Sequence, residues 1–157
     1  DVERSRGLGD VYKRQVGFHG ISSAIEFAVV NLQVENIVIL GHRQCGGIRS
    51  LFQPGAILDG GFVQQWMKIA DPAKDKVLAH NPSADVDHLC RECELTSIVT
   101  SLENLRTFKF VEDAIQKRGM QLIGVYFDLE LGRLSFYDDT IMAFRELDLS
   151  KVPAETL

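Results

Sequence analysis

Two residues that can bind a soft metal ion, His42 and Cys45, stand three positions apart in the stretch GHRQCGG. An imidazole together with a thiolate favours zinc over magnesium or calcium, which prefer oxygen ligands. Two ligands do not make a tight site, so a buried cysteine beside a hydrogen-bonded histidine stays open as the alternative. Gly41, Gly46 and Gly47 would let the backbone turn sharply and let its amides approach a small ligand. We therefore take Gly46 and Gly47 as candidate substrate-binding residues.

The other soft-ligand cluster consists of His88, Cys90 and Cys93. On a helix, which turns by about 100° per residue, His88 and Cys90 would point about 200° apart, so one metal ion could not reach both. Cys90 and Cys93 could share a face, but a redox C-x-x-C pair normally follows a strand at a helix N-terminus. This pair follows the polar stretch NPSADVDHL. We expect small, partly buried thiols.

The elements around the first pair favour a functional position. The apolar, β-branched run NIVIL directly precedes GHRQC and predicts a strand covered on both faces, as in a parallel sheet. Open α/β sheets place their ligands at the carboxyl ends of strands. Upstream, Ser23 and Glu26 have capping-box spacing and predict a helix over 23–32. Its wide apolar arc predicts burial over much of its surface.

The rest of the chain predicts further helices and two strands. Residues 62–79 have a helical pattern in which Pro72 starts a new turn, residues 85–106 predict a long helix, and residues 110–117 predict a short one. Gly119 has the place of its C-cap. The apolar stretch 120–129 and the alternating stretch 132–138 predict strands joined by a hairpin turn at 130–132. Helices with buried strands indicate the α/β class.

Length and composition narrow the possible functions. The 157 residues suit one domain, and 45% hydrophobic residues predict a folded chain. The net charge of −5, without a basic stripe, argues against nucleic acid as a partner. No apolar run approaches the roughly 18–20 residues of a membrane span, which argues against a membrane partner. Three cysteines at spacings unlike a disulfide framework favour a reducing compartment, and we predict the cytoplasm.

Two long stretches resemble the β-class carbonic anhydrases. SSAIEFAVVNLQVENIVILGHRQCGGIRSLF resembles their zinc-binding region, and CELTSIVTSLENLRTFKFVEDAI followed by LIGVYFDLELGRLSFYD resembles their later helix and closing strands. The resemblance covers about residues 17–138. It implies a mainly parallel central β-sheet flanked by helices, a homodimer or higher homo-oligomer, and zinc-dependent reversible hydration of CO2 to bicarbonate. It also implies that His42 and Cys45 are two of three protein zinc ligands.

The sequence departs from this family at one motif. The family's third ligand is a cysteine in a C-x-D-x-R motif a few dozen residues upstream, whose Asp and Arg gate the fourth zinc position. No such motif occurs here, and residues 1–15 contain no cysteine. We expect residues 1–15 to be a non-native or disordered leader and residues 16–157 to be a partial carbonic anhydrase domain that lacks its first strand. The catalytic residues stay unassigned, and His19 and His80 are candidate proton shuttles by type alone.

Three functions follow from these patterns. The first is a zinc lyase of which this chain is an incomplete copy, with weak zinc binding and negligible activity. The second is a non-catalytic relative that serves oligomer assembly or binding and needs no metal. The third is a thiol or structural-zinc module centred on Cys90 and Cys93, for which Cys93→Ser would matter more than Cys45→Ser.

Overall fold

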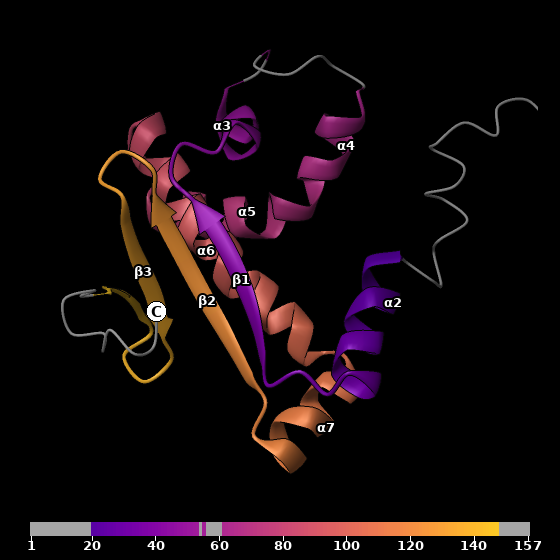
Figure 1. The fold of residues 1–157 in the computed structure, drawn as a ribbon. Helices are drawn as coiled ribbons and strands as arrows, with labels where there is room; N and C mark the ends of the chain where they lie inside the picture. Colours follow the sequence, from indigo (N-terminus) through magenta and orange to yellow (C-terminus); the bar gives the residue numbers. More distant parts are fainter. Residues whose placement is uncertain (1–19, 54, 56–60, 148–157) are drawn as a thin grey trace, which may run out of the picture. The chain divides into compact units, whose positions relative to one another are not determined.

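The structure is a computed structural model that describes residues 20–53, 55 and 61–147 (Figure 1). The predicted leader, residues 1–15, lies outside the described residues. The described part of the chain divides into two compact units, residues 20–36 with 106–121 and residues 37–105 with 122–147, leaving aside residues 54 and 56–60. Among the described helices, none combines the length and the apolar character needed to cross a membrane.

Four strands form one sheet in the order β1-β2-β3-β4. They are β1 (Asn36–His42), β2 (Gln121–Asp128), β3 (Arg133–Asp138) and β4 (Ala143–Glu146). The amide of Gln121 donates to Glu35 O beside the start of β1, and the amide of Arg43 donates to Phe127 O beside its end, so β1 and β2 run parallel. The pairs β2–β3 and β3–β4 are antiparallel. The α/β class, the three longer strands and the hairpin are confirmed, and β4 was not predicted.

The larger unit has helices over the predicted ranges 62–79 and 85–106 and one further helix, at 46–52, that was not predicted. They are α3 (Gly46–Phe52), α4 (Phe62–Met67), the 3₁₀ turn Lys68–Ala70, α5 (Asp71–His80) and α6 (Val86–Arg106). Pro72 lies in the first turn of α5, where a missing amide proton costs no helical hydrogen bond. Side chains of α3, α5 and α6 form one buried cluster, made of Ile48, Ala73, Val77, Leu89, Cys90 and Cys93.

Helix α6 packs closely on one face of the sheet because two strand residues lack side chains. A Cβ on Gly41 of β1 would lie 2.7 Å from Ile98 Cδ1, and a Cβ on Gly124 of β2 would lie 2.9 Å from Ile98 Cγ2 and from Leu102 Cδ1. Ile98 and Leu102 form a buried cluster with Tyr126 of β2. Gly41 therefore serves helix packing, and not the sharp turn that the sequence suggested.

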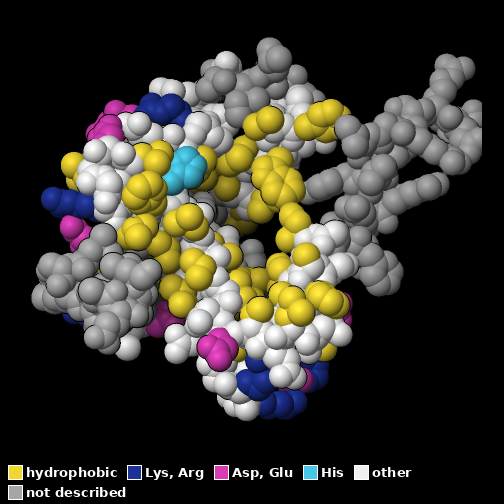
Figure 2. Space-filling view, viewed as in Figure 1, with side chains coloured by type: hydrophobic (Ala, Val, Ile, Leu, Met, Phe, Trp, Pro, Cys, Tyr) yellow, Lys and Arg dark blue, Asp and Glu magenta, His cyan; other side chains and the backbone are white. Residues whose placement is uncertain are grey.

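The expectation that β1 is covered on both faces is wrong for the described part of the chain. Burial alternates along the strand, and the side chains of Val38 and Leu40 are 54% and 64% exposed. Figure 2 shows hydrophobic side chains gathered over this strand. Helix α6 covers the opposite face, so a continuous apolar run here marks a strand with one half-buried and one open apolar face.

The smaller unit contains α2 (Gly20–Glu26), a π-helical turn (Phe27–Asn31) and α7 (Lys109–Arg118). Val29 is buried, and the guanidinium of Arg118 donates to the carbonyl oxygens of Val29 at 3.0 Å and Gln33 at 3.1 Å. These bonds join α7 to the end of the π-helical turn. Gly119 ends α7 in the left-handed conformation with φ 70°, which confirms the predicted C-cap.

Two expectations for residues 23–32 are wrong. The chain is already helical at Gly20, so Ser23 lies inside the helix and cannot act as its N-cap. The helix is also less buried than its sequence suggests, since Val29 is the one buried side chain in Gly20–Asn31 and Phe27 is 55% exposed. A wide apolar arc indicates a face able to pack, and here only the part near α7 packs within its own unit.

Candidate metal centre

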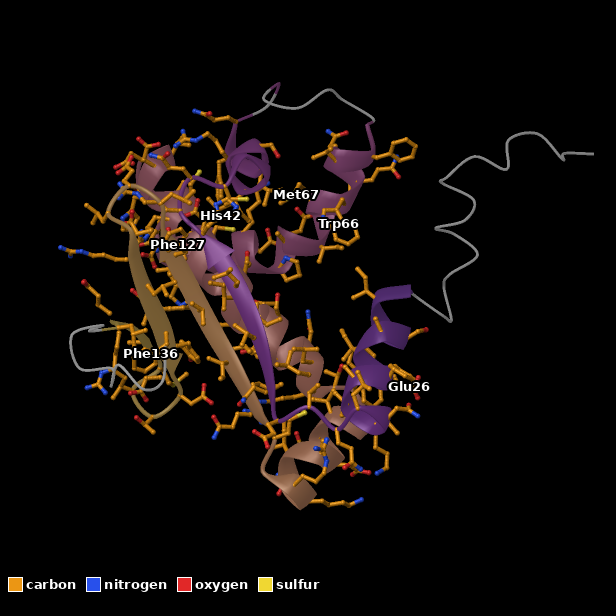
Figure 3. All side chains as sticks on the ribbon, in the orientation of Figure 1. Glu26, His42, Trp66, Met67, Phe127 and Phe136 are labelled. Carbon is orange, nitrogen blue, oxygen red and sulfur yellow. The ribbon has the colours of Figure 1, made fainter. Side chains whose placement is uncertain are left out.

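His42 is the last residue of β1, and its exposed side chain lies at the carboxyl end of the strand (Figure 3). Its Nδ1 is 3.0 Å from the carbonyl oxygen of Arg43. A carbonyl oxygen can only accept, so Nδ1 carries the proton and the lone pair of the neutral ring is on Nε2. A backbone carbonyl that fixes the tautomer in this way is the usual support of a metal-binding histidine.

Cys45 follows through a tight turn and is the N-cap residue of α3. The left-handed residue of this turn is Gln44, with φ 58°, and no glycine is needed for it. The side-chain amide of Gln44 donates to the carboxylate of Glu130, which lies beyond β2. The turn is thus held at the sheet edge, and Cys45 is partly buried against the cluster that contains Cys90 and Cys93.

The two candidate substrate-binding glycines differ in their surroundings. At Gly46, the first residue of α3, an added Cβ would meet nothing within 4 Å. At Gly47 it would lie 2.6 Å from the sulfur of Met67 in α4, the neighbour labelled in Figure 3. The missing side chain of Gly47 therefore makes room for Met67, whereas Gly46 leaves open space. Substrate binding at both residues stays a prediction.

Glu94 of α6 is a buried carboxylate that the sequence analysis missed. It is 5% exposed, and its Oε1 accepts the backbone N–H of Cys45 at 2.9 Å. Its Oε2 accepts the hydroxyl of Tyr126 at 2.7 Å. A signal was present, because Glu94 lies four residues after Cys90 and four before Ile98, on the buried face of the helix. A charge on such a face requires partners.

Tyr126 of β2 is 1% exposed and links the Glu94 carboxylate to the Arg91 guanidinium. Burial and the bond to Glu94 raise the pKa of Tyr126 well above its usual value, so the hydroxyl stays protonated and donates. The guanidinium of Arg91 donates to the same hydroxyl at 2.9 Å and lies 4.3 Å from the centre of the ring. Helix α6 and strand β2 are thereby joined by three polar groups.

A second ionic group ties the carboxyl ends of β1 and β2 together. Arg43 pairs with Asp128 at 3.0 Å and with Glu130 at 2.9 Å. Burial opposes ionisation of Asp128, but the amide of Leu131, the guanidinium of Arg43 and the amide of Glu130 hold its pKa below the usual range. Asp128 is therefore charged at neutral pH. The backbone next to His42 is fixed by this pair.

Cys90 and Cys93 are buried, with 4% and 0% exposure. Burial raises the pKa of Cys93 to about 11 and also raises that of Cys90. A protonated, buried thiol is a poor nucleophile and a poor metal ligand. His88 is exposed near the start of α6 whereas Cys90 is buried, which agrees with the prediction that the two side chains point in different directions. These positions favour structural thiols over a redox or zinc role.

The donor types of His42 and Cys45 fit zinc, but their number falls short of the usual three protein ligands. Across the described ranges, no group of three or more His, Cys, Asp and Glu residues is placed to hold a metal ion. Of the candidate proton shuttles, His19 lies outside the described residues. His80 is exposed at the end of α5, and its Nδ1 is bonded to Lys76 O at 2.7 Å.

Residues 1–134 match the sequence profile of the family described as carbonic anhydrase. The chain is similar to the mitochondrial beta carbonic anhydrase 6 of Arabidopsis thaliana, with 36% identity over 110 residues, 69% of this chain and 38% of that protein. It resembles the structure of the β-carbonic anhydrase CcaA with a TM-score of 0.76 and 24% identity, covering 88% of this chain and 62% of that one.

The chain also resembles one of two tetrameric β-carbonic anhydrases from the ascomycete Sordaria macrospora. The TM-score is 0.66 and the identity 25%, over 74% of this chain and 58% of that one. The chain thus spans less than two fifths of the plant relative and about three fifths of the solved chains. On the profile match and these likenesses, the chain belongs to the carbonic anhydrase family, in its β class.

Proposed function

We propose that this chain supplies His42 and Cys45 to the zinc site of an enzyme that reversibly hydrates CO2 to bicarbonate. The observation that carries the proposal is the bond from His42 Nδ1 to Arg43 O, which leaves Nε2 able to bind a metal ion three residues before Cys45. Activation of water by a Lewis acid is the chemistry that zinc supplies when bound. The residues of this chain orient the ligands: Arg43 O fixes the imidazole, and Glu94 holds the Cys45 amide.

We propose further that this chain alone binds zinc weakly and has negligible hydration activity. Support comes from the sequence, which holds no C-x-D-x-R motif, and from the described residues, which bring no third ligand to His42 and Cys45. An incomplete ligand set leaves coordination positions to water or buffer, and the affinity falls accordingly. A third ligand and an Asp–Arg pair would come from outside the described residues.

Substrate binding is proposed at the first residues of α3. The backbone amides of Gly46 and Gly47 belong to the first turn of the helix, where amides have no acceptor within the helix. The open space at Gly46 suits the approach of a small molecule such as CO2 or bicarbonate. A Gly46→Val variant should therefore weaken inhibition or binding by bicarbonate and leave zinc content unchanged.

The functional form is proposed to be a homodimer or a higher homo-oligomer. The Sordaria relatives are described as tetrameric. Strand β1 is at one end of the strand order and has an exposed apolar face at Val38 and Leu40, and such an edge favours association. Sedimentation velocity should show species larger than 17.6 kDa.

A cytoplasmic location is also proposed, supported by three free thiols among the described residues.

Stopped-flow CO2 hydration in excess zinc tests the catalytic proposal. We expect a rate close to the uncatalysed one, with no change in His42→Ala. A zinc-dependent rate that disappears in His42→Ala would contradict the proposed weak activity and support the site. A zinc-dependent rate that survives in both His42→Ala and Cys45→Ser would contradict the site itself.

A further inference from the structure

Glu94 makes two hydrogen bonds from the interior of the larger unit, one to the turn that carries Cys45 and one to the sheet. We infer that Glu94 is a positioning residue: it fixes the backbone of the Cys45 turn and so sets the direction of the Cys45 thiol relative to His42. The inference rests on the proposed function only in taking Cys45 as a metal ligand. The anchoring itself requires no metal.

The bond to Cys45 holds the turn from the interior, in addition to the bond from Gln44 to Glu130. Cys45 is the N-cap residue of α3, so its amide precedes the helical hydrogen bonds, and its acceptor is the carboxylate 49 residues further along the chain. A bond from an amide to an ionised carboxylate is shorter and stronger than one between neutral groups. Partial burial of this bond reduces competition from water.

The carboxylate of Glu94 is itself held by hydrogen bonds, so it can keep the Cys45 amide in a fixed position. Oε1 is used by Cys45 and Oε2 by the hydroxyl of Tyr126, which prevents rotation of the carboxylate about its last bond. Tyr126 is fully buried in β2, and Arg91 donates to its hydroxyl from the turn of α6 that precedes Glu94. The Cys45 turn is thus held in a fixed position relative to both α6 and β2.

His42, the other candidate ligand, is held beside β2 by different contacts. His42 belongs to β1, and the adjacent Arg43 pairs with Asp128 at the end of β2. Strand β2 therefore carries one support for each ligand, Asp128 for His42 and Tyr126 for Cys45. Loss of Glu94 would loosen the Cys45 end of the turn, while the pair of Arg43 with Asp128 beside His42 and the bond of Gln44 to Glu130 remain. A smaller fraction of molecules would then present both ligands to one metal ion.

Hydrogen exchange at the Cys45 amide, measured by NMR on metal-free protein, tests the anchoring. In Glu94→Ala we expect this amide to exchange at least about tenfold faster, which corresponds to roughly 1.4 kcal/mol. In Glu94→Gln, whose side-chain oxygen can still accept, the change should stay within about threefold. Glu92→Gln removes the same charge from the same helix and serves as the control, with no change expected at Cys45.

Two results would overturn the anchoring: unchanged Cys45 exchange in Glu94→Ala, or an increase no larger than that at the Ile98 amide within α6. The second result would mean general destabilisation. If Glu94→Ala does not fold, the comparison of Glu94→Gln with Tyr126→Phe decides instead. Tyr126→Phe frees Oε2, so Cys45 exchange that is faster in Tyr126→Phe than in Glu94→Gln supports the anchoring, whereas unchanged exchange in Tyr126→Phe overturns it.

Cobalt(II) titration separates this inference from the proposed function. A thiolate-to-cobalt absorption band that disappears in Cys45→Ser would support Cys45 as a ligand, and its absence in the native chain would contradict the proposed metal site. Given such a band, Glu94→Ala should weaken cobalt affinity about tenfold, with Glu94→Gln largely restoring it. Unchanged affinity in Glu94→Ala despite a released Cys45 amide would overturn the positioning role.

Discussion

Gly41→Ala tests the packing of α6 on the sheet that carries the site. The change adds one methyl group to β1, directly below α6. The new Cβ would lie 2.7 Å from Ile98 Cδ1 and 2.8 Å from Ile98 Cγ1. Ile98 is 3% exposed, so it has little room to move away.

The size of the effect follows from these distances. Carbon atoms in contact prefer a separation of about 3.5–4.0 Å, so the side chain or the helix must shift by about 1 Å. Overpacking of a buried core costs about 1–3 kcal/mol, and we expect about 2 kcal/mol for Gly41→Ala. With a urea dependence of about 2 kcal/mol per molar, the unfolding midpoint should fall by about 1 M.

Urea unfolding followed by circular dichroism measures this change, and two further variants make it specific. Gly46→Ala adds the same group where nothing lies within 4 Å, so its midpoint should stay or rise slightly. In an Ile98→Ala background the obstructing atoms are gone, and adding Gly41→Ala should cost less than about 0.5 kcal/mol.

An unchanged unfolding midpoint in Gly41→Ala would contradict the close approach of Ile98 to Gly41. Equal destabilisation by Gly41→Ala in the Ile98→Ala background and in the native chain would contradict it too. Either result would mean that α6 does not approach β1 at this point, and the support of Cys45 through α6 would then lose its basis.

Two other predictions concern burial and charge. At pH 8 an alkylating reagent should label Cys45 in the native protein and label Cys93, with its pKa of about 11 and no exposed surface, only after unfolding; peptide mass spectrometry that finds rapid native labelling of Cys93 would refute its burial. Folding lowers the pKa of Asp128, so the ionised carboxylate adds to the free energy of unfolding. This contribution is complete above the ordinary pKa of about 3.9 and is lost as the pH falls through the lower pKa of the folded state. Asp128→Asn should therefore be less stable than the native chain at pH 7, and this difference should shrink below about pH 4; a difference that is constant down to pH 2 would contradict the charged Asp128.

Local patterns predicted most of the elements because their signals lie within a few residues. The apolar run before His42 predicted β1, the periodicity of 85–106 predicted α6, and Gly119 predicted the end of α7. Burial was harder to predict, since one-sided cover of β1 depends on which elements pack on it, and the sequence of the strand does not contain that information. Strand β4 has only four residues, too few for a clear alternating pattern.

The candidate metal ligands could be recognised from the sequence, whereas the residue that supports Cys45 could not. His42 and Cys45 are three residues apart, so their spacing is visible in the sequence. The contact between Glu94 and Cys45 spans 49 residues and depends on the packing of α6, so residue spacing could not reveal it. A glutamate on the apolar face of a helix was the available signal, and it indicated a need for partners without naming them.

Zinc content per chain, measured beside cysteine variants, tests whether His42 and Cys45 are the zinc ligands of this chain. Protein purified under reducing conditions would be equilibrated with zinc across a range of concentrations and analysed for bound metal beside Cys45→Ser and Cys93→Ser. We predict weak binding that Cys45→Ser abolishes and Cys93→Ser retains. Binding that survives in Cys45→Ser, or that Cys93→Ser abolishes in a folded protein, would contradict the assignment of His42 and Cys45 as the zinc ligands of this chain.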